Sequence, residues 1–389
     1  MKIAIVCPDG LSIVLFCKGI IRVLKRIKDT EVFVLSKDGT YKSEIESLGV
    51  KSVTVDMYRF FNPLKDFQYF VTLYRIFKRE KFDIVINFTT KPNIYGTFAA
   101  KMAHINKIIS HVVGLGSISL PSDTLTGKLL RYVFLKLYCL SCKLSEKLWF
   151  TNRNDLNYFI SQGITMQGKS VLTKNYLDTD EYSPTSVSEE TLSTLRKELQ
   201  LVEHNRIVVM VARLIWPKGI KEFVEAAQLL KDKYPYLKFL LVAPVESGGP
   251  NAVPESYVRE KEKASNFKWL GFRSDVKSFY ALSEVTVLPS YYKEGGYPRT
   301  LLEPMSMGKP IITTDSPDCR EMVEDGKNGY LVPIKDSKLL AEAIEKLIID
   351  ENKRKAFGLY SRLKAEKEFD EKKIVSEALV KLGIINASC

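Results

Sequence analysis

No stretch of this sequence reaches the ~20 uncharged apolar residues with which an α-helix crosses a bilayer. The first apolar run meets Asp9 too early for a secretory signal peptide, so we expect it to form a β-strand. Both absences argue against a membrane-spanning or secreted protein. They favour a chain that stays in the cytoplasm.

Residues typical of metal sites are also scarce. Only Cys139 and Cys142 form a C-x-x-C pair, and no second pair completes a zinc site, so core or surface thiols are favoured. Asp178 and Asp180 enclose a threonine, but they lie in an expected linker, where a turn is favoured over a metal-binding D-x-D. We therefore expect no metal requirement and no cofactor.

Acidic residues are sparse in the first part of the chain. Residues 1–170 hold 25 Lys and Arg against 13 Asp and Glu, and the net charge of the whole chain is +12. The entire positive excess thus belongs to the N-terminal half. Such a surface favours an anionic partner, which could be a membrane, a diphosphate or a nucleic acid.

Predicted strands alternate with predicted helices along both halves of the chain, which indicates parallel βαβ units. We expect an α/β protein with two doubly wound domains, residues 1–178 and 179–372. The linker is expected near residues 176–188, rich in Asp, Ser, Thr and Pro. Residues 373–389 are expected to form a C-terminal helix that packs back on the first domain.

A basic loop follows a predicted strand at residues 211–223, VARLIWPKGIKEF. Arg213 and Lys218 bracket the loop, and Gly219 precedes a predicted helix. Free N–H groups at a helix N-terminus, together with two cations, suit a diphosphate. The alternative is a solvated turn with ordinary surface charges.

A second loop, at residues 290–315, follows the strand predicted at residues 285–289. Glu294 precedes two glycines that allow the backbone to approach a ligand. Pro298 suits the start of a helix, and Glu303 lies about one turn into it. The carboxylate of Glu303 could accept the hydroxyls of a ribose. The alternative is a strand–turn–helix junction with capping carboxylates.

These two loops and the LGF turn at residues 270–272, in this order and spacing, resemble glycosyltransferase family 4. Its members are retaining enzymes of the GT-B fold, and the resemblance covers nearly the whole chain. It implies two Rossmann-like domains facing a central cleft. It also implies that a leaving diphosphate helps to take the acceptor proton, without a covalent enzyme intermediate.

The resemblance assigns roles to individual residues. Arg213 and Lys218 would neutralise the donor diphosphate, and Glu294 would act beside them as a catalytic residue. Glu303 would bind the ribose, and the turn after residue 270 would flank the base. The donor-binding residues it implies are Gly271, Phe272, Gly295, Gly296, Tyr297, Pro298, Leu302 and Glu303.

The sequence departs from the family pattern twice. Eight residues separate Glu294 from Glu303, where the family has seven, so we expect a bulge in the glycine loop. The spacing therefore does not predict the direction in which the Glu294 side chain points. The family often has His or Glu directly before a GLG turn, but here His111 lies two positions before Val113. We expect a satisfied structural role for His111.

The N-terminal half offers candidate acceptor contacts. Lys91 and Asn93 follow a predicted strand at residues 82–88, and Gly114 and Gly116 follow the next. Residues 125–149 combine apolar residues with several cations, which is typical of a helix on an anionic membrane. A core helix with a basic outer face fits equally well. The candidate membrane contacts are Lys128, Arg131 and Lys136.

Within the family, the run ARLIWPKGIKEF resembles bacterial enzymes that build undecaprenyl-diphosphate-linked glycans. It favours those that move N-acetylgalactosamine from a UDP-sugar onto a polyprenyl-diphosphate-linked saccharide in protein N-glycosylation, at the inner face of the cell membrane. Capsule and O-antigen transferases with other sugar nucleotides are alternatives, and a GT-B epimerase or phosphorylase is a further one. A nucleic-acid-binding protein is disfavoured because it leaves the glycine loop and both carboxylates unexplained.

Overall fold

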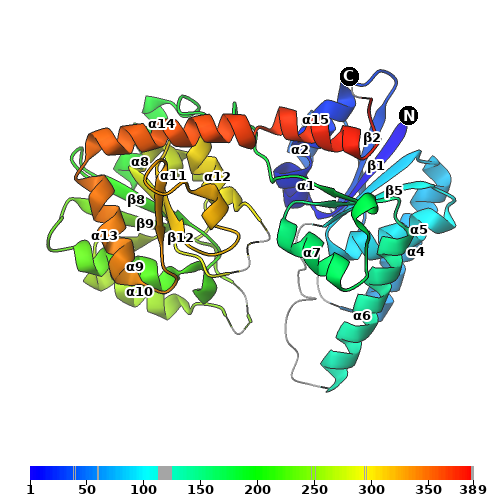
Figure 1. Cartoon of the computed structure of the whole chain (residues 1–389), viewed down its shortest axis with the longest axis horizontal. Helices are drawn as coiled ribbons and strands as arrows, with labels where there is room; N and C mark the ends of the chain where they lie inside the picture. Colours follow the sequence, from blue (N-terminus) through cyan, green and yellow to red (C-terminus); the bar gives the residue numbers. More distant parts are fainter. Residues whose placement is uncertain are drawn as a thin grey trace. The chain divides into compact units, whose positions relative to one another are not determined.

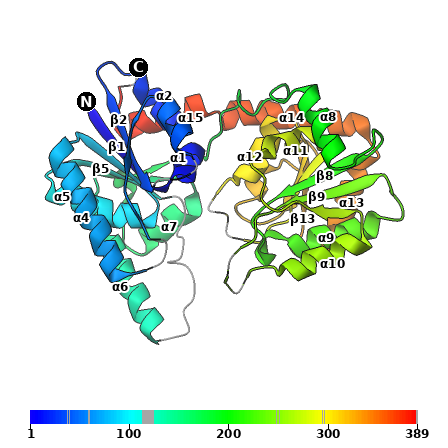
Figure 2. The ribbon, with the colours of Figure 1, turned by 180° about the vertical axis from the view of Figure 1, so that it is seen from behind.

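A computed structural model describes the chain except positions 38, 40, 59, 60, 113–124, 247, 250, 293, 295 and 387–389, and except the side chains at 125–127, 130, 131 and 264. The chain divides into two units (Figures 1 and 2). The first comprises Met1–Lys174 and Lys372–Cys389, and the second comprises Asn175–Glu371. The boundaries expected from the sequence, after residues 178 and 372, lie close to these divisions.

The first unit contains a parallel sheet of seven strands in the order β3-β2-β1-β4-β5-β6-β7. Its register pairs Ile5 with Val34 on one side and with Ile86 on the other. The strands are β1 (Lys2–Asp9), β2 (Glu31–Lys37), β3 (Lys51–Thr54), β4 (Ile84–Phe88), β5 (Lys107–Val112), β6 (Lys147–Phe150) and β7 (Ser170–Leu172).

Helices bury both faces of this sheet. Side chains from α4, α5, α6 and α7 pack on the face that carries Ala4 and Leu148, and the alternate residues Ile3 and Ile5 are buried as well. Two buried faces are expected of a parallel sheet. The helical segments are α1 (Gly10–Phe16), α2 (Lys18–Lys25), α3 (Lys42–Ser47), α4 (Pro63–Glu80), the π-helical turn η1 (Pro92–Gly96), α5 (Thr97–Met102), α6 (Leu125–Leu144), α7 (Arg153–Ser161) and the 3₁₀ turn η3 (Gln167–Lys169).

The second unit contains a parallel sheet of six strands in the order β10-β9-β8-β11-β12-β13. In both sheets the strand order reverses beside the first strand, between β1 and β4 and between β8 and β11. Ligands of open α/β sheets bind at such switch points, beyond the carboxyl ends of the strands. The strands are β8 (Arg206–Val211), β9 (Leu237–Val242), β10 (Phe267–Trp269), β11 (Val285–Leu288), β12 (Ile311–Thr314) and β13 (Gly329–Val332).

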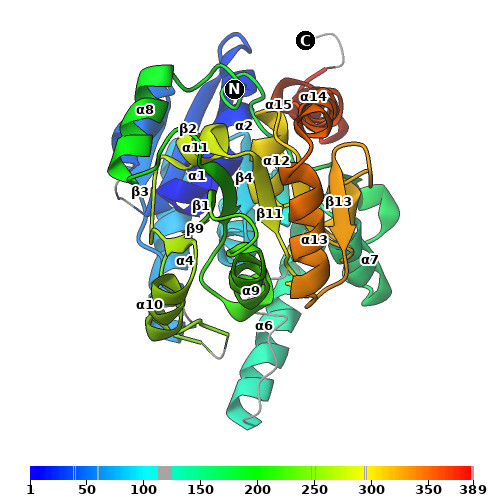
Figure 3. The ribbon, with the colours of Figure 1, turned by 90° about the vertical axis from the view of Figure 1, so that its left-hand side faces the viewer.

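The helices of the second unit form two apolar layers. One layer includes α9, α12 and α13 against Val208 and Met210, and the other includes α8 and α11 against Ile207 and Val209. Helices α9 and α13 lie side by side (Figure 3). The helical segments are α8 (Glu189–Glu198), η4 (Trp216–Lys218), α9 (Ile220–Leu230), α10 (Glu255–Ala264), α11 (Val276–Leu282), α12 (Arg299–Ser306), η5 (Arg320–Met322), α13 (Ser337–Ile348) and α14 (Glu351–Glu368).

The ends of several helices follow from local chemistry. Asn62 accepts a hydrogen bond from the backbone of Lys65 at the start of α4, and Pro63 occupies the first turn, where its missing N–H costs nothing. Asp336 caps α13 in the same way. At the chain end, α15 (Glu371–Lys381) begins at the last residue of the second unit and continues into the first.

The helix expected over residues 125–149 is wrong beyond Leu144. Helix α6 ends there, and residues from Lys147 form β6, which pairs with Ile109 of β5. The apolar spacing continues in a helix-like way through this segment, but pairing in the sheet satisfies its backbone groups. Within the described residues, no helix combines the length and apolarity needed to span a membrane.

The doubly wound α/β architecture expected from the sequence is confirmed in both units. The strands that were not expected are short, such as β10 and β13, and their pairing depends on the neighbouring strand.

Candidate functional site

The residues expected to bind the donor follow three strands of the second sheet. Arg213 follows β8, Gly271 follows β10, and Glu294 follows β11. Because all six strands are parallel, their carboxyl ends meet at one edge. Strands β8 and β11 are neighbours at the switch point, so the loops after them lie next to each other.

Gly219 permits the close approach of these two loops. Its φ is 82°, in the left-handed region, and a Cβ at this position would lie 2.2 Å from the carbonyl oxygen of Pro289. The backbone N–H of Tyr291 donates to the carbonyl of Pro217 over 2.8 Å. Only glycine fits this junction, which fixes Lys218 beside the loop after β11.

Lys218 and Glu294 form a buried ion pair. Their side chains are 10% and 6% exposed, and the Lys218 ammonium donates to Glu294. The second carboxylate oxygen of Glu294 accepts a hydrogen bond from Ser290 Oγ over 2.5 Å. In this structure Glu294 therefore aims at the cation expected to meet the diphosphate.

Tyr292 brings the two expected diphosphate cations together. The centre of its ring lies 5.1 Å from Cζ of Arg213 and 5.3 Å from Nζ of Lys218. The ring face attracts both charges. Arg213 is about half exposed and lies 3.8 Å from Glu246. Sequence reasoning missed Tyr292, although an aromatic residue directly after a strand at the switch point was a usable signal.

Glu303 occupies a buried position on α12. The side chain of Arg299, one turn earlier, donates to Glu303 over 3.2 Å. Burial raises the pKa of Glu303, and the charge of Arg299 opposes that rise. Burial raises the pKa of the Tyr280 hydroxyl, and the nearby charge of Glu303 adds to that rise. Sequence reasoning missed Arg299 and Tyr280.

The other residues expected to bind the donor differ in whether their side chain or only their backbone can reach a ligand. Phe272 is 66% exposed beside Gly271, whose φ of 64° forms a tight turn, so an aromatic ring is available there. Leu302 is fully buried in the core, which leaves only its backbone for a ligand. Pro298 precedes α12 as its N-cap residue, and Gly296 has a φ of 85°. Gly295 lies outside the described residues.

The side chain of Tyr297 is engaged within its own unit. Its hydroxyl donates to Glu321 over 2.7 Å, and its ring centre lies 5.3 Å from that of Phe369. Its backbone φ is 41°. This residue of the lengthened loop thus adopts a left-handed conformation that tyrosine rarely adopts.

The two described acceptor candidates lie in the interior of the first unit. Lys91 pairs with Asp66 over 2.5 Å and donates to the carbonyl of Tyr58 over 2.8 Å. The side-chain amide of Asn93 donates to the backbone of His111 and to Tyr138. Lys91 is therefore already neutralised. Gly114 and Gly116 lie outside the described residues.

His111 is buried between two aromatic rings. Its ring centre lies 4.7 Å from that of Phe88 and 4.2 Å from that of Trp149. Burial lowers its pKa to about 3, so the ring is neutral at pH 7. Neither ring nitrogen has a hydrogen-bond partner in the region that the structure describes. The burial of His111 agrees with the expected structural role, but its nitrogens are not satisfied as expected, since the indole N–H of Trp149 donates to Thr173 instead.

Helix α6 has two different halves. Near its start Lys128, Leu129 and Tyr132 are exposed, with Leu129 65% exposed, whereas Tyr138 and Cys142 are buried near its end. Lys136 is exposed, and its ammonium lies 5.3 Å from the ring centre of Tyr132. The side chain of Arg131 lies outside the described part. The first turns of α6 thus fit the surface alternative, and its last turns fit the core alternative.

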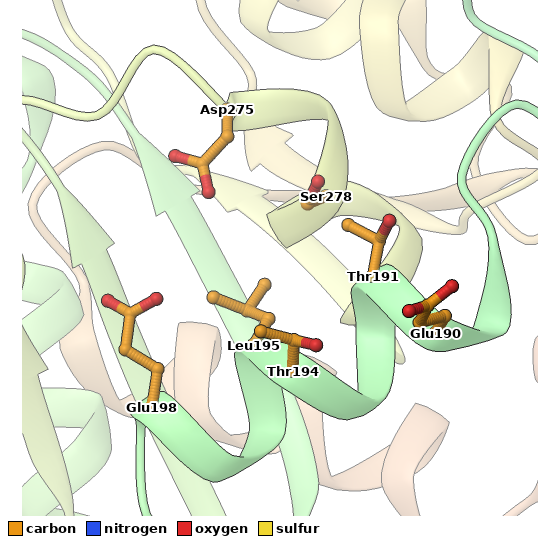
Figure 4. A pocket seen from close by; sticks show the side chains of 7 residues that line it. All are labelled: Glu190, Thr191, Thr194, Leu195, Glu198, Asp275 and Ser278. Carbon is orange, nitrogen blue, oxygen red and sulfur yellow. The ribbon is translucent and has the colours of Figure 1, made fainter.

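A pocket of about 260 Å³ lies on the second unit between α8 and α11 (Figure 4). None of the expected donor residues lines it. Three carboxylates lie around it, and two of them, Glu198 and Asp275, pair with Arg273. Its lining residues are Glu190, Thr191, Thr194, Leu195, Glu198, Asp275 and Ser278.

Two family models match the chain. The model described as "Glycosyl transferase 4-like" matches residues 10–152, and "Glycosyl transferases group 1" matches residues 193–364. The second match includes both loops at the switch point of the second sheet.

Characterised relatives resemble the chain over most of its length. The N,N'-diacetylbacillosaminyl-diphospho-undecaprenol alpha-1,3-N-acetylgalactosaminyltransferase of Campylobacter jejuni is 32% identical, over 91% of each chain. The capsular polysaccharide biosynthesis glycosyltransferase CapM of Staphylococcus aureus is 25% identical, over 92% of this chain and 91% of its own. The UDP-Gal:alpha-D-GlcNAc-diphosphoundecaprenol alpha-1,3-galactosyltransferase of Escherichia coli is 26% identical, over 74% of this chain and 72% of its own.

Solved structures share the fold. Anabaena HepE, crystallised with UDP and glucose, is 22% identical, with a TM-score of 0.77 over 99% of this chain and 100% of its own. WaaG, a glycosyltransferase involved in lipopolysaccharide biosynthesis, is 15% identical, with a TM-score of 0.71 over 99% of this chain and 100% of its own.

Proposed function

The chain belongs to glycosyltransferase family 4 and has the GT-B fold, and we propose that it moves N-acetylgalactosamine from a UDP-sugar to a polyprenyl-diphosphate-linked saccharide. The sugar and the acceptor are those named for the Campylobacter relative, which aligns with 91% of this chain. A place in bacterial glycan and N-glycoprotein synthesis is part of the proposal; the same relative supports it only through its undecaprenol-linked acceptor.

One observation supports a donor diphosphate most directly, namely the convergence of Arg213 and Lys218 on the ring of Tyr292 at the switch point. Two cations there oppose the negative charge that develops on the leaving diphosphate. In the structure Glu294 forms an ion pair with Lys218. We infer that the diphosphate replaces Glu294 at the ammonium, and that Glu294 then faces the reacting sugar.

The remainder of the donor has matching partners. The carboxylate of Glu303 would accept both ribose hydroxyls, and the exposed ring of Phe272 would lie against the uracil. The backbone of residues 296–298 would contact the sugar. Retention of configuration is part of the proposal, carried by family membership.

The acceptor would be presented by the first unit at an anionic membrane surface. The exposed turns of α6 combine Lys128 and Lys136 with Leu129, Tyr132 and Val133. Apolar side chains flanked by cations suit the interface of an anionic bilayer. Lys91 would meet the acceptor phosphate only after separating from Asp66, so its acceptor role is the weaker part of the proposal.

A galactosyltransferase is the second candidate, because the Escherichia coli relative is named for transfer from UDP-Gal to a diphosphoundecaprenol-linked sugar. Capsule assembly is a third candidate, supported by the CapM relative. All three candidates require a sugar nucleotide and differ in the sugar.

The test is a transfer assay with short polyprenyl-diphosphate saccharides and a panel of UDP-sugars. UDP-N-acetylgalactosamine is expected to give the highest kcat/KM and to raise the Tm by mass action. Faster transfer from UDP-galactose would favour the second candidate. Equal inactivity with every UDP-sugar would overturn the proposal. Lys221→Ala is a matched control for Lys218 variants, since Lys221 is an exposed lysine on α9, three residues away.

A further inference from the structure

Tyr297 lies in the loop between Glu294 and α12, here called the donor loop, and its backbone is strained. Its φ of 41° is the left-handed region, in which a bulky side chain is a true outlier. Such strain persists only where surrounding contacts hold it, and it concentrates at functional sites.

Among the contacts that hold Tyr297 are those with Asn175, Phe369 and Glu321, which belong to different segments. Its carbonyl accepts a hydrogen bond from the side chain of Asn175 over 3.1 Å, and its ring packs on Phe369. Its hydroxyl donates to Glu321. Asn175 is the first residue of the second unit, and Phe369 lies two residues before its end.

The segments at these two positions are joined to each other where the chain passes between the units. The N–H of Leu177 donates to Phe369 over 3.0 Å, and the N–H of Glu371 donates to Leu177 over 2.8 Å. Thr179 donates to Asp370 over 2.6 Å. The donor loop therefore contacts both segments through which the chain passes between the units, residues 175–179 and 369–371, here called the crossing segments. It accepts a hydrogen bond from the first and packs a ring against the second.

We propose that Tyr297 is a positioning residue that couples occupancy of the donor loop to these crossing segments. Glu294 lies three residues before Tyr297, so a diphosphate that takes Lys218 from Glu294 displaces the loop to which Tyr297 belongs. Because Tyr297 is held at its carbonyl, ring and hydroxyl, the displacement reaches Asn175 and Phe369. The inference rests on the proposed function, since it requires a nucleotide in the donor loop.

The test measures amide hydrogen exchange of the full-length protein with and without UDP. In the wild type, UDP is expected to change the exchange rates of the Leu177 and Glu371 amides by roughly threefold or more, as expected for a modest shift in local opening free energy. Tyr297→Phe removes only the hydroxyl contact, and Asn175→Ala removes the carbonyl contact. Both variants should still bind UDP, about three- to tenfold more weakly, and should lose most of the response at Leu177 and Glu371.

Tyr360→Phe is the matched control, because Tyr360 also donates to a carboxylate of the second unit, that of Glu324, over 2.6 Å. It should respond to UDP as the wild type does. Wild-type protein that binds UDP without a change at Leu177 and Glu371 would refute the coupling, as would an unaltered response in both variants. Failure of the wild type to bind UDP at all would instead refute the proposed function.

Discussion

Replacement of Lys218 separates the catalytic role of this residue from its structural role. Lys218→Met removes the charge while keeping an extended apolar stem, and it leaves Glu294 buried without its cation. Breaking a buried pair by removing one partner costs about 3–5 kcal/mol. For a unit of this size, that corresponds to a fall in Tm on the order of 10 °C. Loss of a preorganised charge at the leaving group should lower kcat by about 10²–10³.

The double variant Lys218→Met with Glu294→Gln distinguishes the two effects. The glutamine removes the unpaired carboxylate and keeps a group that Ser290 can reach, so most of the lost Tm should return. The transfer rate should stay low, because the cation facing the diphosphate is still missing, and it should fall below that of Glu294→Gln alone, which is the control for the loss of the Glu294 carboxylate. Thermal unfolding and single-turnover transfer rates measure the two quantities. Recovery of the rate together with the Tm would refute the diphosphate role of Lys218.

Three further predictions concern other parts of the chain. Burial raises the pKa of Glu303, so its carboxylate should become protonated on acidification at a pH above the ordinary range of a glutamate, and the affinity for UDP should fall there. Glu303→Gln should bind UDP weakly and without this pH dependence. An unchanged KM for the donor in this variant would contradict the ribose role. Because the pKa of His111 is lowered to about 3, the unfolded chain binds the proton first. Stability should therefore fall by about 1.4 kcal/mol for each pH unit between ~6.5 and the folded-state pKa, and His111→Leu should remove that component in urea titrations. Replacing Lys128 and Lys136 with Glu should release the protein from vesicles that contain anionic lipid, whereas the same change at the exposed lysines 263 and 268 of the second unit should not; equal sedimentation of both variants would count against the α6 surface.

Much of the fold was predictable because the signals are local. Apolar runs broken by turn residues locate the long central strands, such as β4 and β8. Alternation with helices requires parallel pairing, and parallel pairing brings the loops of Arg213 and Glu294 to one edge of the sheet. The segment after Leu144 was mispredicted, because its helical spacing was overridden by pairing with β5.

The partners of the site residues were not predictable, because they come from distant positions in the chain. Lys218 meets Glu294 across 76 positions, and Lys91 meets Asp66 across 25. Residue type shows that a lysine can bind a phosphate, but not that a buried carboxylate already holds it. The same holds for the loop that contains Tyr297: its greater length was visible in the sequence, but the contacts of Tyr297 with Asn175 and Phe369 were not.

By itself, therefore, the sequence determined the α/β class, the two-domain organisation and the loops that carry the donor chemistry, since these depend on periodicity and on residues close together in the chain. Only the tertiary structure decided where Glu294 points, that Arg299 accompanies Glu303, and that Lys91 is neutralised within the first unit. Those outcomes depend on which charges are buried together. In a low-dielectric interior, a buried charge must find a partner wherever the packed chain places one.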